Sequence, residues 1–240
     1  MPSPDRFLNG VSNVNYDSPF GWYPHISPVT WASHMEEMLV LPSSLGWTHT
    51  QTNGTAAVTS GTYGTGILTQ TLGGADNDLS QMQATTATWG MIAGKKAVFE
   101  ARVKVDKGAA GTIGEQELFI GLASVQTSTN FSAADGIAVM PVDDAIGFWS
   151  PDGSTNLNCL NHTTDVESIQ VGAAVYADAT WMTLSFYFDG TNIFFYKDGV
   201  VIAELTTYTT NAIGRTLFIK AGEAKPSVLS CDYLFVAKER

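Results

Sequence analysis

The chain has 240 residues, of which 44% are hydrophobic and 15% are charged. This much apolar material can build a full core, and the low charge argues against a disordered chain. The net charge of −11 argues against nucleic acid and anionic lipid as partners, because tight phosphate contact needs clustered Lys and Arg.

No stretch is long and apolar enough to span a bilayer, and the opening residues lack the basic-then-apolar order of a secretory signal. We therefore expect a soluble chain that is not exported. Cys159 and Cys231 are too few for a disulfide scaffold and have no His or Cys neighbour at metal-ligand spacing. They are predicted to be buried core thiols, and one bridge between distant strands is the alternative.

Residues 1–44 are predicted to form an extended arm. Six of the nine prolines lie at or before Pro42, which excludes a central strand or a long helix there. Within the arm, Ser33-His-Met-Glu36 has the capping-box pattern and predicts a short helix from about His34 to Val40. The arm also carries aromatic side chains that need burial, on a partner or back on its own domain: Phe7, Tyr16, Phe20, Trp22, Tyr23 and Trp31.

Residues 45–240 are predicted to form one all-β sandwich. From Trp47 onward, turn signals recur at short intervals and apolar residues alternate between them, as in β-sandwiches. The predicted strands are 47–51, 56–59, 66–71, 78–84, 96–105, 117–123, 136–140, 145–150, 157–160, 168–174, 181–189, 192–197, 200–205, 216–221 and 229–238.

The strand pattern is clearest from Trp181 to Leu205, which reads as three consecutive antiparallel strands. Met182, Leu184, Phe186 and Phe188 recur with the period of two that places them on one face of a strand. Asp198-Gly199 supplies the positive backbone angles that a tight hairpin needs.

Two further strands indicate how the sheets are covered. In 96–105, the core face carries Ala97, Phe99, Ala101, Val103 and Val105, and the other face carries Val98, Glu100, Arg102 and Lys104. The run 117–123 is apolar on both faces, which is typical of a central strand that is covered on each side.

Together with Asp135-Gly-Ile-Ala and the closing Cys231-Asp-Tyr-Leu-Phe-Val-Ala, these segments resemble the concanavalin A-like jelly rolls. Residues 181–199 resemble the laminin-G-type pattern of Trp, alternating strand, Asp-Gly, strand with Tyr and Asp-Gly. The resemblance covers roughly residues 46–240 and implies a jelly-roll β-sandwich of two antiparallel sheets. The fold hosts lectins, glycan hydrolases and structural modules, so it does not specify function. The layout of jelly roll and aromatic arm also resembles capsid decoration proteins of tailed bacteriophages.

The sequence lacks the Glu-x-Asp-x-x-Glu strand of the glucanases, although glycoside hydrolysis needs two facing carboxyl groups. The nearest carboxylate pairs are Glu115 with Glu117 and Asp143 with Asp144, and both pairs are interpreted as solvated. Glu100 and Arg102 are expected to form a weak surface ion pair. Residues 76–78, which read Asp-Asn-Asp, are interpreted as a turn rather than a Ca²⁺ site.

The sequence therefore predicts a non-enzymatic capsid decoration or cement protein of a virus particle, with no cofactor and no metal. The arm aromatics would bind the major capsid protein and other copies of the chain, and the phage resemblance implies a homotrimer. The expected location is the capsid surface of the virion, after synthesis in the host cytoplasm. The alternative is a carbohydrate-binding module in which Trp89 or Trp149 stacks on a sugar ring, and a glycoside hydrolase is a distant third.

Overall fold

The computed structural model describes residues 29–39, 46–60, 66–108, 111–125, 144–163 and 166–240. All of the regular structure in these residues is β-strand. The strands are β1 (Trp31–Glu36), β2 (Trp47–Thr52), β3 (Gly54–Ser60), β4 (Gly66–Leu72), β5 (Leu79–Ala84), β6 (Ala97–Asp106), β7 (Gln116–Ala123), β8 (Ala145–Ser150), β9 (Asn156–Thr163), β10 (Val166–Val175), β11 (Thr180–Phe188), β12 (Ile193–Lys197), β13 (Val200–Leu205), β14 (Gly214–Ala221) and β15 (Val228–Glu239).

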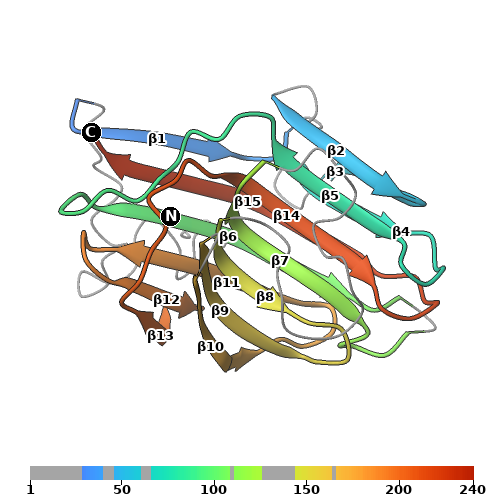
Figure 1. Cartoon of the computed structure of the whole chain (residues 1–240). Helices are drawn as coiled ribbons and strands as arrows, with labels where there is room; N and C mark the ends of the chain where they lie inside the picture. Colours follow the sequence, from blue (N-terminus) through green and yellow to red (C-terminus); the bar gives the residue numbers. More distant parts are fainter. Residues whose placement is uncertain (1–28, 40–45, 61–65, 109–110, 126–143, 164–165) are drawn as a thin grey trace, which may run out of the picture.

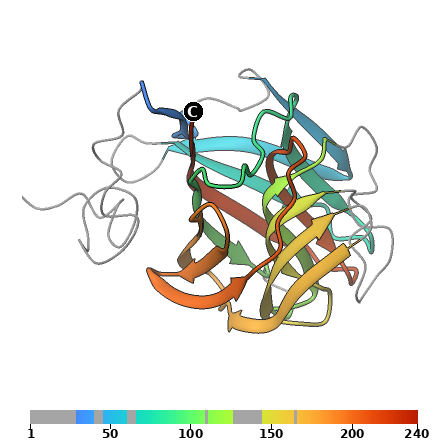
Figure 2. The ribbon, with the colours of Figure 1, turned by 60° about the vertical axis from the view of Figure 1, so that its left-hand side comes forward.

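The strands form two antiparallel sheets that pack face to face (Figure 1). Sheet A has the order β13-β12-β11-β6-β15-β4-β3, and β1 pairs with the second half of β15. Sheet B has the order β10-β9-β8-β7-β14-β5-β2. Figure 2 shows the same two layers after a turn of 60°. The predicted β-sandwich is confirmed, and most predicted strands lie within two residues of those in the structure.

The core lies between the two inner faces. Phe99 of β6 stacks on Phe186 of β11 with ring centroids 5.1 Å apart, and Phe148 of sheet B meets Phe195 of sheet A edge to face at 5.4 Å. The predicted core face of β6 is buried in this cluster. Cys159 and Cys231 are free and buried in the same core, so the prediction of core thiols is confirmed.

The three consecutive strands predicted from 181 to 205 are β11, β12 and β13, paired in sequence order. Asp198 and Gly199 have φ angles of 51° and 80°, which are the positive angles that the hairpin between β12 and β13 needs. The core face of β11 is as predicted, because Met182, Leu184 and Phe186 are all buried.

The predicted helix from His34 to Val40 is wrong in its described part, because residues 31–36 form β1. β1 pairs with β15 over the register Trp31↔Glu239 to Glu36↔Leu234. Pairing with a strand about 200 residues away overrides the local capping pattern, since tertiary context outweighs a weak local propensity. The other five arm aromatics lie outside the described residues, as does the predicted strand 136–140, so their roles stay predictions.

The outer face of sheet A carries a polar network instead of the expected Glu100–Arg102 pair. Glu100 is buried and accepts a 2.7 Å hydrogen bond from the Tyr233 hydroxyl. Arg102 forms its ion pair with Asp232 at 2.9 Å and lies over the ring of Trp181. The expectation fails because β6 lies between β15 and β11, whose side chains offer each group a closer partner.

No helix in the described residues is long and apolar enough to cross a membrane.

Candidate functional site: the outer face of sheet B

The outer face of sheet B collects aromatic and polar side chains from five adjacent strands. It lies on the side of the sheet that points away from the sandwich core, and its apolar members form a cluster separate from that core. The polar and aromatic members are Gln81, Gln83, Glu117, Phe119, Trp149, Asn158, Thr216, Phe218 and Lys220.

A row of aromatic rings crosses the middle of this face. Phe218 of β14 is opposite Phe119 of β7, and Phe119 is opposite Trp149 of β8. Next to this row, Gly121 and Gly147 also lie opposite one another. A Cβ atom added at either glycine would lie 3.0 Å from Cζ of Phe119. The two glycines therefore leave the space that lets the Phe119 ring lie against the sheet.

Glu117 lies beside the aromatic row, two residues before Phe119 on the middle strand β7. Its Oε1 accepts a hydrogen bond of 3.2 Å from Nε1 of Trp149, and its Cα partner on β14 is Lys220. The interpretation of Glu117 as a solvated side chain is wrong, because its side chain is buried. Its described neighbours include Trp149 of β8 and Lys220 of β14, and the pattern of a strand apolar on both faces was the available signal.

Two glutamines of β5 lie next to the Phe218 end of the row, where Gln81 is opposite Phe218. Gln83 donates to the Thr216 hydroxyl at 2.8 Å and to the Ser124 carbonyl at 3.0 Å. Gln81 donates to Gln83 Oε1 at 3.3 Å, whereas its own Oε1 is buried and accepts no hydrogen bond in the described part of the chain. A buried acceptor without a donor is costly, by about 1–3 kcal/mol. Gln81 is 1% exposed, so this unmet acceptor lies inside the outer face of sheet B and not on its surface.

The structure separates the two tryptophans that were candidates for sugar stacking. Trp149 lies in the aromatic row, with 5% of its surface exposed. Trp89 packs into the core between the sheets, where its backbone pairs with Ile213. No strand in the described residues packs over the outer face of sheet B. Of the two, only Trp149 lies on a sheet face with other aromatic and polar groups.

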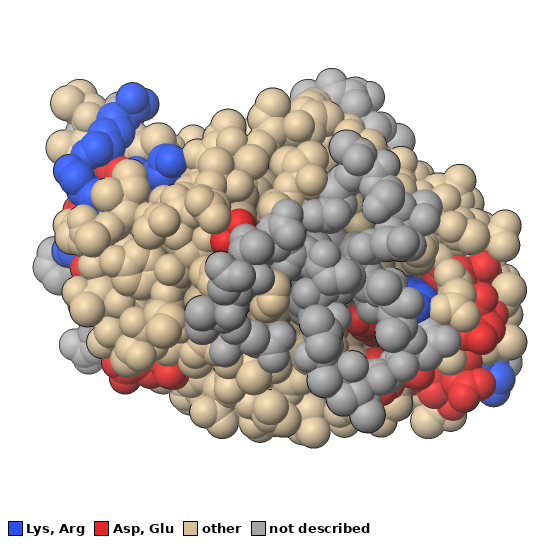
Figure 3. All heavy atoms as spheres, viewed as in Figure 1, with Lys and Arg blue, Asp and Glu red and all other residues tan. Residues whose placement is uncertain are grey.

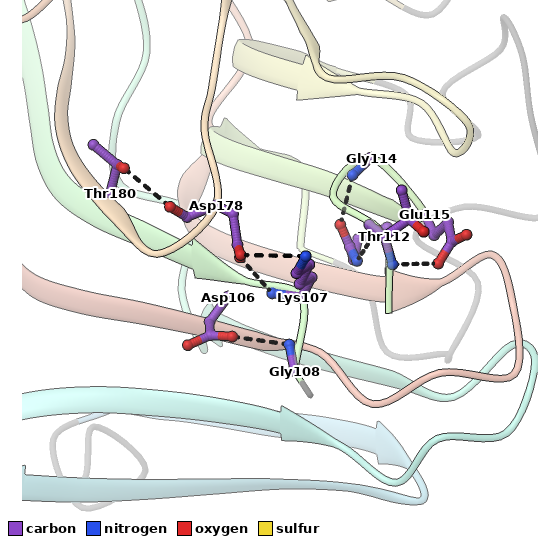
Figure 4. Close-up of polar contacts among 9 residues, drawn as sticks. Asp106, Lys107, Gly108, Thr112, Gly114, Glu115, Asp178 and Thr180 are labelled. Carbon is purple, nitrogen blue, oxygen red and sulfur yellow. Dashed lines mark hydrogen bonds and ion pairs between the residues drawn. The ribbon is translucent and has the colours of Figure 1, made fainter. Parts of the chain in front are cut away.

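The carboxylates in the loops at one end of the sandwich act as turn-forming groups (Figure 4). Asp106 accepts from the backbone N–H of Gly108, Glu115 from that of Thr112, and Asp178 from that of Lys107. Lys107 Nζ also lies 3.7 Å from Asp178. These carboxylates satisfy local backbone donors, as Asp side chains commonly do in turns.

Two more acidic candidates have structural partners. Asp78 accepts from the backbone N–H of Ala75 at 2.8 Å and from the Asn53 amide at 3.0 Å, which agrees with a turn. Asp144 was interpreted as solvated, and this is wrong, because it is buried and accepts from Thr209 and Asn211. Asp143 lies outside the described residues. Within the ranges that are described, no three His, Cys, Asp or Glu residues form a group suited to a metal ion.

Charge is unevenly spread over the surface. On the face seen in Figure 3, a group of Lys and Arg lies near the end of the chain and the larger groups of Asp and Glu lie at the opposite end. In the basic group, Lys95 Nζ donates to the Arg240 carbonyl and Lys238 Nζ donates to the Thr88 carbonyl. Both ammonium groups already donate hydrogen bonds within the protein, which weakens the case for a nucleic-acid surface.

Neither a family model nor a curated protein matches this chain. Several solved structures do match it. A protein of unknown function from Shewanella oneidensis MR-1 has a TM-score of 0.59 at 13% identity, and the match covers 95% of this chain and 97% of that protein's chain. An endo-1,3-β-glucanase from Streptomyces sioyaensis has a TM-score of 0.55 at 10% identity, with coverage of 89% and 98%. The carbohydrate recognition domain of Emp46p also has a TM-score of 0.55, at 9% identity, with coverage of 84% and 94%.

At these identities the similarity shows the fold alone, and the fold is the concanavalin A-like jelly roll of lectins and glucanases. The expectation of a non-enzymatic protein is overturned, because similar structures include enzymes. Besides the glucanase, they include an endo-β-1,4-glucuronan lyase from Trichoderma reesei and the Crh5 transglycosylase, each at 13% identity. None of these structures with a stated function is a capsid protein.

Proposed function

We propose that this protein recognises a carbohydrate chain through the outer face of sheet B. Gln81 carries this proposal, since its Oε1 is buried beside the aromatic row without a donor in the described residues. A sugar presents hydroxyl donors along its rim and C–H groups on its ring faces. Such a ligand can satisfy Gln81 and pack against Phe218 and Trp149 at the same time, because its hydroxyl groups and its apolar ring faces point in different directions.

The sheet face favours a neutral sugar over a polyanionic one. The chain carries a net charge of −11, and on this face Glu117 is opposed by one cation, Lys220, on the neighbouring strand. A polyanion would be repelled by the overall charge without a compensating basic cluster. Recognition of a neutral glycan needs hydrogen bonds and ring stacking, both of which these side chains offer.

Glu117 is the buried carboxyl group that the structure describes on this face. Hydrolysis by the usual route needs a second carboxyl group about 5–10 Å away, and the buried residues described on this face do not include one. The described side chains therefore support recognition more directly than cleavage. A test of function needs to measure turnover as well as binding.

The test is to screen the full chain against immobilised neutral and acidic glycans and to titrate any ligand found by calorimetry. Because Trp149 is 5% exposed, a ring that stacks on it must rearrange this face, so tryptophan fluorescence should change on binding. Loss of one stacked ring is worth about 1.5–3 kcal/mol, so Trp149→Ala should weaken binding about tenfold or more. The proposal is contradicted if the chain binds none of the glycans, or if Trp149→Ala binds its glycan with unchanged affinity.

We also propose a second, separate role as a decoration protein on a virus particle, based on the aromatic and Pro-rich residues 1–44. Its support is the sequence, because the arm aromatics Phe7, Tyr16, Phe20, Trp22 and Tyr23 need burial. Trp31, by contrast, packs with Met35 near Phe235 on the chain's own sheet A. The chain should then co-purify with virus particles through a density gradient, and replacing Trp22 and Tyr23 by Ser should release it. Particles that lack the chain would contradict this role.

A further inference from the structure

Arg215 and Trp47 meet on the inner face of sheet B, across an intervening strand. β5 lies between β14, which carries Arg215, and β2, which begins at Trp47 (Figure 1). Trp47 belongs to the core cluster between the sheets, and Arg215 is two residues before the core residue Leu217, which places it on the same face of β14. On β5, the Cα partner of Trp47 is Ala84. Because the alanine side chain is short, the two long side chains meet above it, and the guanidinium carbon of Arg215 lies 4.9 Å from the centroid of the Trp47 ring.

This contact leaves three hydrogen-bond donors without an acceptor in the described part of the chain. They are Nε and Nη1 of Arg215 and Nε1 of Trp47, and all three atoms are buried. Trp47 is 2% exposed, whereas Arg215 is partly exposed, so a ligand can reach its guanidinium from solvent. A buried donor without an acceptor destabilises a fold, and more so when the donor is charged. Three such donors at one place indicate that an acceptor binds there.

The charge of Arg215 is only partly balanced by the described residues. The ion pairs that these residues form do not include Arg215. Burial lowers the pKa of the Arg215 guanidinium, and the charge of Glu36 counteracts part of this shift. Glu36 itself already has a partner in His34, whose Nε2 lies 3.5 Å from Oε2 of Glu36. The site therefore holds a positive charge that a bound anion would balance.

We propose that Arg215 and Trp47 bind the carboxylate group of a ligand. A guanidinium offers N–H donors in a planar fork that matches the two oxygens of a carboxylate, and the indole N–H adds a further donor. A carboxylate carries one negative charge, whereas a phosphate group carries up to two at neutral pH. The single charge suits this site better, because Glu36 acts on it and the chain has a net charge of −11. The carboxylate can belong to a small organic acid or to an acidic sugar unit.

The carboxylate site is separate from the carbohydrate site that we propose on the outer face of sheet B. Thr216 follows Arg215 in β14 and is bonded to Gln83 on the outer face, and successive side chains of a strand point to opposite faces. Arg215→Met should therefore leave the binding of a neutral glycan unchanged. The two proposals can fail separately.

The experiment titrates the full chain with acetate and with glucuronate by calorimetry, at constant ionic strength because added salt screens charge. The first test variant is Arg215→Met, which removes both the charge and the fork, and the second is Arg215→Lys, which keeps the charge alone. Trp47→Phe keeps a ring and removes the indole N–H, and it tests the site if the arginine variants fail to fold. The matched control is Arg240→Met, the same change at an exposed arginine.

The unchanged chain should bind at least one of the two probes with a Kd below about 10 mM. Arg215→Met should weaken this binding about 30-fold or more, and Arg215→Lys and Trp47→Phe should each weaken it about tenfold. Arg240→Met should bind normally. Glucuronate bound more tightly than acetate would identify an acidic sugar as the ligand, and acetate bound at least as tightly would identify a small organic acid. The proposal is overturned if neither probe binds saturably up to about 10 mM, or if Arg215→Met and Trp47→Phe bind as the unchanged chain does.

Discussion

The indole of Trp149 and the carboxylate of Glu117 are joined by a hydrogen bond of 3.2 Å between the neighbouring strands β8 and β7. The bond fixes a ring and a carboxylate side by side on the outer face of sheet B. Both side chains are buried, so the bond is protected from competing water. The same two side chains therefore contribute to the stability of this face and to the carbohydrate site that we propose on it.

Replacing Glu117 by Ala should cost about 1–3 kcal/mol of unfolding free energy, because the buried indole N–H loses its acceptor. Glu117→Gln keeps an acceptor oxygen and should cost less. Urea unfolding followed by fluorescence measures both. Glu223→Ala is the control, since Glu223 is exposed, and it should stay within about 0.5 kcal/mol of the unchanged chain. Equal costs for Glu117→Ala and Glu223→Ala would show that the bond is unimportant.

Gly121→Ala should destabilise the chain by about 1–3 kcal/mol, the usual cost of overpacking. A Cβ atom there would lie 2.3 Å from the Ile146 carbonyl oxygen and 2.7 Å from Cα of Gly147, and this backbone cannot move without disturbing the sheet. The control is Gly214→Ala in β14, where the nearest atom is at 3.4 Å. The midpoint temperature of thermal unfolding should be clearly lower for Gly121→Ala than for Gly214→Ala. The reverse order would refute this account of the face.

The sequence predicted the sandwich well because its strands are locally encoded. The strand 200–205 has the predicted ends, since Asp198-Gly199 and the following valines suffice to define it. β1 was missed because its partner is the distal end of β15, and the local pattern of Ser33 and Glu36 suits a helix equally well. Pairing over such a distance leaves no local signal.

The candidate site was harder to predict than the fold. Trp89 and Trp149 look alike in the sequence, but one lies in the core and the other on the outer face of sheet B. What distinguishes Trp149 is its position beside Phe119 and Phe218, which come from strands about 30 and 70 residues away in the chain. Glu117 was misread for the same reason, because its neighbours come from separate strands.

Stability should fall as the pH rises above about 9, and Cys159 should be one cause. Burial raises the pKa of the Cys159 thiol from 9.0 to about 12. The folded chain therefore holds this proton while the unfolded chain loses it. The thiol contributes its full stability below pH 9 and loses it progressively as the pH rises toward 12. At pH 10 the loss should be about 1.4 kcal/mol.

Urea unfolding at about pH 8 and pH 10 measures this slope. In Cys159→Ala the chain should be less stable at pH 8 because a cavity is left, but its further loss at pH 10 should be smaller by about 1.4 kcal/mol. Burial also raises the pKa values of Tyr176 and Tyr196 to about 12. These two groups begin to lower stability as the pH approaches 10, where half of the unfolded tyrosine is ionised, and they do so equally in both chains. Identical slopes in both chains would contradict the role of Cys159.

Tyr233→Phe should cost about 1.5–3 kcal/mol, the range for hydrogen bonds to charged groups. The Tyr233 hydroxyl donates to Glu100 at 2.7 Å, and both side chains are buried. Burial first, and the Glu100 charge second, raise the pKa of Tyr233 well above its usual value. Tyr208→Phe is the control, because Tyr208 is half-buried and packs with its ring 4.5 Å from Phe188. A cost below about 0.5 kcal/mol for Tyr233→Phe would contradict the proposed network.

The most direct test of the carbohydrate proposal compares two tryptophans on opposite outer faces. Trp149 lies on the outer face of sheet B, and Trp181 lies on that of sheet A, beneath Arg102 and Lys104. Titration of Trp149→Leu and Trp181→Leu with the glycan that the unchanged chain binds best gives the answer. We expect Trp149→Leu to lose at least tenfold in affinity and Trp181→Leu to bind normally. Equal affinities, or a loss confined to Trp181→Leu, would contradict a site on sheet B.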